Sequence, residues 1–93
     1  VVYFELLRRG YDVAIGKVGN AEIDFIAAKA DEKIYVQATE SMESETVRTR
    51  ELAPLQGIAD NYEKIVLSLH PGLETSYDGI KSIDLIEWLL ENQ

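Results

Sequence analysis

Cysteine is absent from this 93-residue sequence, and histidine occurs only once, as His70. Without cysteine the chain can form neither a disulfide framework nor a cysteine-ligated zinc site, which is compatible with a reducing cytosol. His70 has no second histidine with which to form a metal-binding pair, so we expect an ordinary loop residue. No apolar run approaches the roughly eighteen residues that span a bilayer. We therefore expect no membrane partner and a cytoplasmic location.

Basic residues are also scarce, because nine lysines and arginines stand against 17 aspartates and glutamates and leave a net charge of −8. Nonspecific nucleic-acid binders neutralise phosphates with clustered basic side chains, so the overall charge disfavours DNA as a partner. The side chains that could still form a local basic patch are Arg8, Arg9, Lys17, Arg48 and Arg50. We expect these to be solvated charges, with Arg48 and Arg50 pairing with the acidic residues of segment 40–45.

The remaining composition is that of an ordinary globular protein, with 46% hydrophobic and 28% charged residues. Ninety-three residues suffice for one hydrophobic core, so we expect a single domain over residues 1–93. The sequence opens within a helical pattern at Val1, without a methionine or a helix cap. This start predicts a fragment cut from a larger protein.

One predicted hairpin organises the chain. Residues 21–28 and 33–39 both alternate with a period of two, which is typical of strands with one packed face. If residues 29–32 form the turn, residues whose numbers sum to 61 lie opposite each other. Asp24 then faces Gln37 across the hairpin.

In this register Glu22 faces Thr39, and the two faces of the hairpin differ in polarity. The polar face holds Glu22, Asp24, Tyr35, Gln37 and Thr39. The core face holds Ile23, Phe25, Ala27, Ile34, Val36 and Ala38. A polar cluster on a central hairpin predicts an active site, the remnant of one, or a hydrated edge.

The other elements follow from apolar spacing and from cap and turn residues. Further strands are predicted at residues 11–16, 62–69 and 80–83. Helices are predicted at residues 1–9, from about residue 46 to the Asp60-Asn61 pair, and from Asp84, which would be the N-cap of the last helix. The middle helix should bury Val47, Leu52, Leu55 and Ile58. Pro54 removes a backbone donor within that helix, which predicts a kink or a break.

The predicted order is therefore α-β-β-β-α-β-β-α, with a loop over residues 70–79. Strands joined by tight turns are antiparallel, so the first three should form a meander. The helical excursion after the hairpin suits a crossover connection, which predicts a mixed sheet with helices on both faces in an α/β fold.

This order, with an acid on the second strand and polar residues at alternate positions on the third, resembles the restriction-endonuclease-like fold of the PD-(D/E)xK nuclease superfamily. The resemblance implies that Asp24 carries the metal-binding aspartate. Gln37 stands where the superfamily has its second acid, and Thr39 where it has its lysine. The helix-borne glutamate of the superfamily would precede Val1.

A closer resemblance covers nearly the whole chain. It is carried by residues 4–11 (FELLRRGY), 16–17 (GK), 22–25 (EIDF), 34–37 (IYVQ), 60–64 (DNYEK) and 79–81 (GIK). These segments resemble the C-terminal domain of a group of prokaryotic AAA-type ATPases, in which a nucleotide-binding module precedes a small nuclease-like domain. The chain has no glycine-rich phosphate loop, so the resemblance implies that ATP binds in the missing N-terminal module.

The polar cluster has two interpretations. Phosphodiester cleavage needs oxygen ligands for Mg²⁺ and a cation to stabilise the phosphate. Asp24 and Gln37 are the candidate metal ligands, and Glu22 is near, but Thr39 cannot replace an ammonium group. Lys17, expected in a loop, is the plausible substitute, because Lys33 lies roughly 13 Å back along its strand. A weak Mg²⁺ site with poor catalysis is therefore the most that this fragment could hold.

The alternative is a cross-strand hydrogen-bonded network of Asp24, Gln37 and Thr39, on a face partly covered by the first helix. The leading hypothesis is accordingly a noncatalytic, nuclease-like accessory domain. Its partner would be the ATPase module in cis, another protomer of a homo-oligomer, or a substrate. The alternatives are a Mg²⁺-dependent nuclease active only in the full-length protein, and a DNA-binding module without cleavage.

Overall fold

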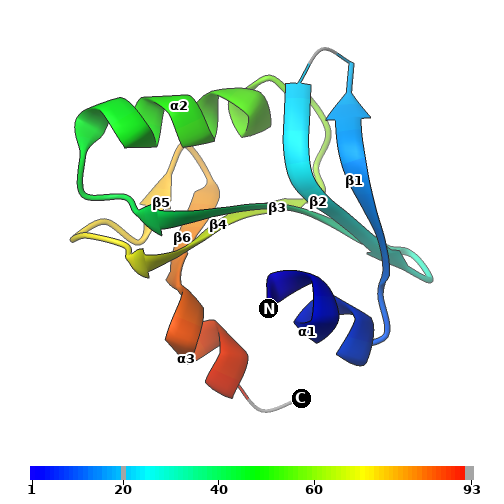
Figure 1. Ribbon diagram of the computed structural model, residues 1–93. Helices are drawn as coiled ribbons and strands as arrows, with labels where there is room; N and C mark the ends of the chain where they lie inside the picture. Colours follow the sequence, from blue (N-terminus) through cyan, green and yellow to red (C-terminus); the bar gives the residue numbers. More distant parts are fainter. Residues whose placement is uncertain (20, 92–93) are drawn as a thin grey trace.

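The computed structural model describes residues 1–19 and 21–91, and within them the chain forms one six-stranded sheet with helices on both faces (Figure 1). The helices are α1 (Val2–Arg8), α2 (Glu45–Gln56) and α3 (Leu85–Leu90). The strands are β1 (Asp12–Val18), β2 (Ala21–Lys29), β3 (Glu32–Ser41), β4 (Glu63–His70), β5 (Ser76–Tyr77) and β6 (Ile80–Asp84). None of the described helices is long and apolar enough to cross a membrane.

The strand order is β1-β2-β3-β4-β6-β5. The first three strands pair antiparallel, β4 pairs parallel to β3, and β6 pairs parallel to β4. The predicted meander and the mixed α/β sheet are therefore confirmed. One element is added to the predicted order, because β5 forms a two-residue antiparallel pair with β6 inside the segment expected to be a loop. A strand this short carries no periodic pattern from which it could be predicted.

The helices divide the core into two layers. One layer lies under α1 and α3 and contains Val2, Leu6, Ala27, Ile34, Val36, Ile65, Leu67 and Trp88. The other lies under α2 and contains Ile23, Tyr35, Met42, Leu52, Leu55, Ile58, Val66 and Ile80. Figure 1 shows α2 on one side of the sheet and the two other helices on the opposite side. Side chains alternate across β3, which is buried on both faces as a central strand should be.

Side-chain N-caps fix the first turns of α2 and α3. Asp84 Oδ1 accepts hydrogen bonds from the backbone N–H groups of Ile86 (2.8 Å) and Glu87 (3.1 Å), so the predicted cap of α3 is confirmed. Ser44 caps α2 through a bond from the Val47 N–H (3.4 Å). Of the two outcomes predicted at Pro54, a kink or a break, the break is wrong, since α2 continues through Pro54 as one element.

The predicted end of α2 at Asp60-Asn61 is also wrong. The helix stops at Gln56, two residues after Pro54, and Gly57 forms its C-cap. Ile58 is buried as predicted, but from the connection to β4 and not from the helix. Of the predicted core positions of the helix, Leu52 and Leu55 are buried, and Val47 is half-buried.

Candidate functional site

The predicted hairpin register is confirmed where β2 and β3 are paired. The ladder runs from Lys29 opposite Glu32 to Phe25 opposite Val36. The two strands part after the Phe25–Val36 pair. We call this point of separation, with the side chains of Asp24 and Gln37 that lie at it, the fork.

Beyond the fork β2 stays paired only with β1, and β3 only with β4. Glu22 lies opposite Lys17 of β1, and Thr39 lies opposite Ser68 of β4. The predicted pairing of Glu22 with Thr39 is wrong, because the β2–β3 ladder ends at the Phe25–Val36 pair, while β2 remains paired with β1 and β3 with β4. The fork brings together only the inner half of the predicted polar cluster.

A β-bulge shapes the outer side of the fork. The register between β1 and β2 shifts between Ala14 and Gly16, so that Asp24 and Phe25 together occupy the space opposite one residue of β1. A bulge resets the alternation of side chains along its strand. Ile23 consequently packs in the layer under α2, which corrects the prediction that it shares a face with Phe25.

Side chains close the fork by bonding to the backbone. The Asp24 N–H donates to Gln37 Oε1 (2.8 Å), and the Ala38 N–H donates to Asp24 Oδ2 (2.9 Å). Gln37 Nε2 donates to the backbone oxygen of Glu51 in α2 (3.3 Å). Asp24 is exposed and Ala38 is half-buried, so their backbone N–H groups lie at the surface where the two strands separate. The two side chains supply hydrogen-bond partners for these groups and connect the fork to α2.

This use of Gln37 bears directly on metal binding. Gln37 is 5% exposed, and both ends of its carboxamide are engaged. Its carbonyl oxygen cannot turn toward an ion without breaking the bond to Asp24, whereas Asp24 keeps its second carboxylate oxygen free of the Ala38 bond. Thr39 contributes no bond to this network, and α2 covers the fork where α1 was expected, since the Gln37 side chain bonds to α2.

Glu51 is the residue at the fork that sequence reasoning missed. Its side chain is 16% exposed, and burial raises its pKa, with the negative charge of Asp24 raising it further. Arg50 pairs with it loosely, at 3.7 Å. The available signal was its spacing, because Glu51 precedes the apolar Leu55 by one helical turn, and Leu55 is buried.

The lysines near the hairpin lie at its two ends. Lys17 is in β1, not in a loop as predicted, and it lines a shallow groove of about 270 Å³ with Glu22 and Asp24. Lys33 lies at the far end, with its ammonium 5.2 Å from the ring centre of Tyr62. Within residues 1–19 and 21–91, no three acidic or histidine side chains converge as a metal-binding group.

Tyr35, predicted on the polar face, belongs to a separate network at that far end. Its hydroxyl donates to Asp60 Oδ2 (2.6 Å), and Lys64 Nζ pairs with Asp60 Oδ1 (3.1 Å). Burial, reinforced by Asp60, raises the pKa of Tyr35 to about 12. The hydroxyl is therefore a permanent donor that fixes the connection before β4.

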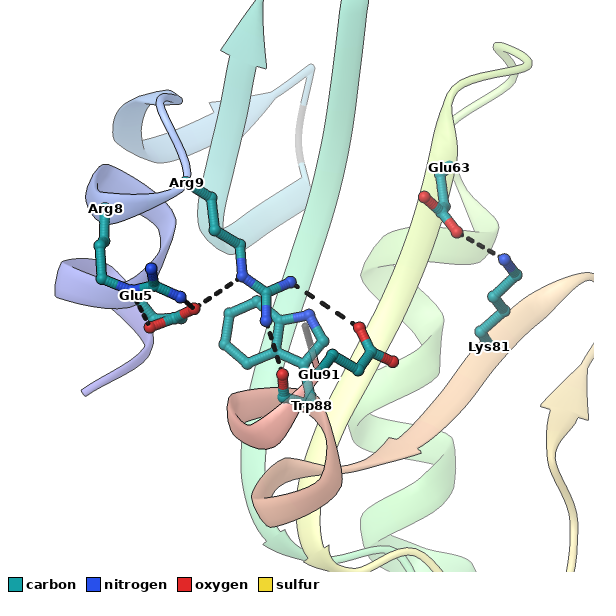
Figure 2. Close-up of polar contacts among 7 residues, drawn as sticks. All are labelled: Glu5, Arg8, Arg9, Glu63, Lys81, Trp88 and Glu91. Carbon is teal, nitrogen blue, oxygen red and sulfur yellow. Dashed lines mark hydrogen bonds and ion pairs between the residues drawn. The ribbon is translucent and has the colours of Figure 1, made fainter. Parts of the chain in front are cut away.

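Arg8 and Arg9, predicted to be solvated charges, belong to an ion cluster, in which Arg8 is 53% exposed and Arg9 16% (Figure 2). Glu5 accepts from Arg8 (2.6 Å) and Arg9 (2.7 Å), and hydrogen bonds from both hold the pKa of Glu5 at about 2. Arg9 also donates to the Trp88 backbone oxygen, lies 4.2 Å from the Trp88 ring centre, and approaches Glu91 at 3.9 Å. These five residues form the α1–α3 ion cluster.

The remaining candidates have structural surroundings. Arg48 donates to the backbone oxygens of Met42 (3.0 Å) and Glu43 (2.9 Å), which corrects the predicted pairing with acidic side chains of that segment. Arg50 pairs with Glu51 of its own helix. His70 is exposed but lies in β4, where it pairs with Ser41, which corrects its expected place in a loop. Trp88 is 4% exposed in the core.

The chain is similar to an uncharacterized protein of Haemophilus influenzae, with 44% identity over 91 residues. The match covers 98% of this chain and 22% of that protein, so the chain spans about a fifth of the length of its relative. No family model matches the chain, and no solved structure matches it.

Proposed function

We propose that this chain is a noncatalytic, nuclease-like accessory domain of an AAA-type ATPase whose nucleotide-binding module lies outside these residues. The order of the first six elements supports a restriction-endonuclease-like core: a helix, an antiparallel three-strand meander, a crossover helix, and a strand parallel to the third. The relative, in which the matching segment is 22% of the length, supports a larger parent protein.

One observation carries the noncatalytic assignment: the polar side chains of the fork are committed to its backbone. A metal-dependent nuclease presents open oxygen ligands to its ion. Here the Gln37 carboxamide bridges β2 and α2, and one oxygen of Asp24 accepts from Ala38. Thr39 brings no positive charge to the position at which the superfamily has its lysine. The fork therefore acts as a brace between two separating strands.

Incubation with nucleic acid tests this assignment. Linear and supercoiled DNA and single-stranded RNA are incubated with the full-length protein and Mg²⁺ or Mn²⁺, beside its Asp24→Ala variant. We expect both proteins to leave all substrates intact. Metal-dependent cleavage by the wild type that disappears in Asp24→Ala would overturn the assignment.

A Mg²⁺-dependent nuclease, complete only in the full-length protein, is the second candidate, because Glu51 adds a carboxylate near Asp24 that the motif did not supply. For this candidate, Glu51→Gln should abolish cleavage as fully as Asp24→Ala does. A DNA-binding module has less support. Arg48 is engaged with backbone oxygens, and Arg50, although 66% exposed, lies beside the carboxylate of Glu51, so the two do not form an unpaired basic patch.

A further inference from the structure

Two serines are buried among apolar side chains beneath α2. Ser68 of β4 is 0% exposed, and Ser82 of β6 is 7% exposed. Among the buried side-chain oxygens and nitrogens of the part of the chain that the structure describes, only these two hydroxyls lack a hydrogen-bond partner. Buried polar groups in native proteins are almost always bonded, because an unpaired one keeps the full cost of its lost hydration. The two hydroxyls therefore point to a partner that no side chain supplies.

The strand register places both serines on the face that α2 covers. Val66 packs in the layer under α2. Side chains alternate along a strand, so Ser68, two residues after Val66, faces the same layer. Ser82 lies opposite Val66 in the parallel ladder between β4 and β6 and shares its face. The two hydroxyls thus reach one layer from neighbouring strands.

The spacing of the two serines leaves room for one small molecule between their hydroxyls. Ser68 lies opposite Asp84, two residues beyond Ser82, so the two serines are diagonal neighbours. Adjacent strands are about 4.8 Å apart and two residues span about 6.6 Å, which puts the two Cα atoms about 8 Å apart. The hydroxyls cannot bond to each other at this separation, whereas a molecule between them bonds at about 2.8 Å to each.

The surroundings determine the chemistry of the bridging molecule. None of the side chains that the structure describes as buried is charged, so an ion at this place would lose its hydration without a compensating charge. Water both donates and accepts, as the serine hydroxyls do. A buried water typically makes about three hydrogen bonds to polar groups that otherwise lack a partner. Thr39, opposite Ser68 in the ladder between β3 and β4, brings a third hydroxyl to the same face.

We propose that Ser68 and Ser82 hold an internal water molecule that bridges β4 and β6 beneath α2. Each serine hydroxyl thereby gains the partner that the chain does not provide, and Thr39 supplies the third contact. Thr39 and Gln37 are two residues apart on β3 and share a face. The water therefore extends the polar groups of the fork across the centre of the sheet to β6.

Alanine substitutions in the full-length polypeptide test the bridge. Hydrogen exchange of the peptides that contain β4 and β6 is measured by mass spectrometry in Ser68→Ala, Ser82→Ala and the double variant. Each single substitution leaves the other serine unpaired, so we expect each to speed exchange by about threefold or more. The double variant should exchange more slowly than the product of the two single effects, because it also removes the hydroxyl left unpaired. Ser76→Ala, at an exposed site of β5, is the control and should leave the rates unchanged.

Hydroxyls without a bound water would give the opposite sign. Alanine would then remove an unpaired buried group, and exchange in each single variant would be unchanged or slower. That result would overturn the proposal, and so would single effects that multiply in the double variant, since they would show that the two serines share no partner. A crystal structure of the full-length protein gives the direct observation. The bridge requires an ordered water within hydrogen-bonding distance of both hydroxyls, and serine hydroxyls bonded to backbone oxygens would overturn it.

Discussion

The fork and the α1–α3 ion cluster lie on opposite sides of the sheet and treat their carboxylates in opposite ways. In the ion cluster, Glu5 bonds to two arginines, and its pKa falls to about 2. At the fork, Glu51 is partly buried near Asp24, and its pKa rises. The ion cluster therefore gains stability from its charges, whereas the fork holds two like charges together at some cost.

The difference bears on whether the polar residues of each cluster have a functional or a structural role. Like charges held together are more common at functional sites than in structural clusters, because stability alone does not favour them. The amide of Gln37, however, gives the fork a structural role through its bonds to Asp24 and α2. In the proposed function, the carboxylates persist where a metal site would lie, and the neutral amide braces the strands.

Restoring an acid at the fork should have the largest effect. Gln37→Glu loses the donor to the Glu51 backbone oxygen and adds a third negative charge at a position that is 5% exposed. We expect the free energy of unfolding to fall by about 2–4 kcal/mol, measured by urea denaturation. Thr49→Glu adds the same charge at an exposed site of α2 and should change it by less than about 0.5 kcal/mol. If the two substitutions lowered the free energy of unfolding equally, a charge at the fork would be no more costly than one at the surface.

The ion cluster should be most sensitive at Arg9. Arg9→Met removes the bond to the Trp88 backbone oxygen, the contact with the Trp88 ring and the pair with Glu5. We expect a loss of about 1–3 kcal/mol in chemical denaturation. Arg8→Met, in which the lost guanidinium is 53% exposed and bonds only to Glu5, should lower the denaturation midpoint much less than Arg9→Met does. A larger loss of stability in Arg8→Met would contradict the claim that Arg9 is the main stabilising residue of the ion cluster.

Neutralising Glu51 should stabilise the protein at neutral pH. Its folded pKa lies above the ordinary value of 4.5, so the penalty is absent below pH 4.5 and develops as the pH rises through the folded value. Glu51→Gln should therefore gain a few tenths of a kcal/mol at pH 7, because solvent screens part of the repulsion, and nothing in acid. Denaturation of both proteins at several pH values measures the difference. Glu40→Gln, at an exposed site of β3, should show no such pH dependence.

Glu5 should give the opposite pH dependence. Its folded pKa of about 2 lies below the ordinary value of 4.5, so its contribution is complete above pH 4.5 and is lost as the pH falls toward 2. The urea midpoint of the wild type should decline over this range. Glu5→Gln should flatten that part of the profile while lowering the midpoint at neutral pH. A profile unchanged by the substitution would show that other carboxylates carry the acid sensitivity.

Local pattern was enough to predict most of the fold. The alternation of residues 21–28 and 33–39 predicted the register that pairs Phe25 with Val36. Asp84, as an N-cap residue, predicted the start of α3. These features depend on neighbours in the sequence. Periodicity, turn chemistry and capping all act over a few residues, so they could be read directly.

The site depended on contacts between elements that are far apart in the sequence. Thr39 pairs with Ser68 of β4, and the bulge at Asp24 depends on β1, so neither could be inferred from the hairpin alone. Glu51 reaches the fork because α2 crosses over it, which places a residue of one element beside Asp24 of another. Sequence reasoning therefore named Asp24 and Gln37 but not the bonds that hold them.

A metal titration tests the central claim most directly. Mg²⁺, and Mn²⁺ as a paramagnetic probe, are added to the full-length protein while the amide resonances of Asp24, Gln37 and Ala38 are followed, with Leu73 as a distant reference. If the fork is a brace, these amides show no saturable shift or selective broadening at millimolar metal. Saturable changes confined to Asp24, Gln37 and Ala38, and abolished by Asp24→Ala, would contradict the account and establish a metal site.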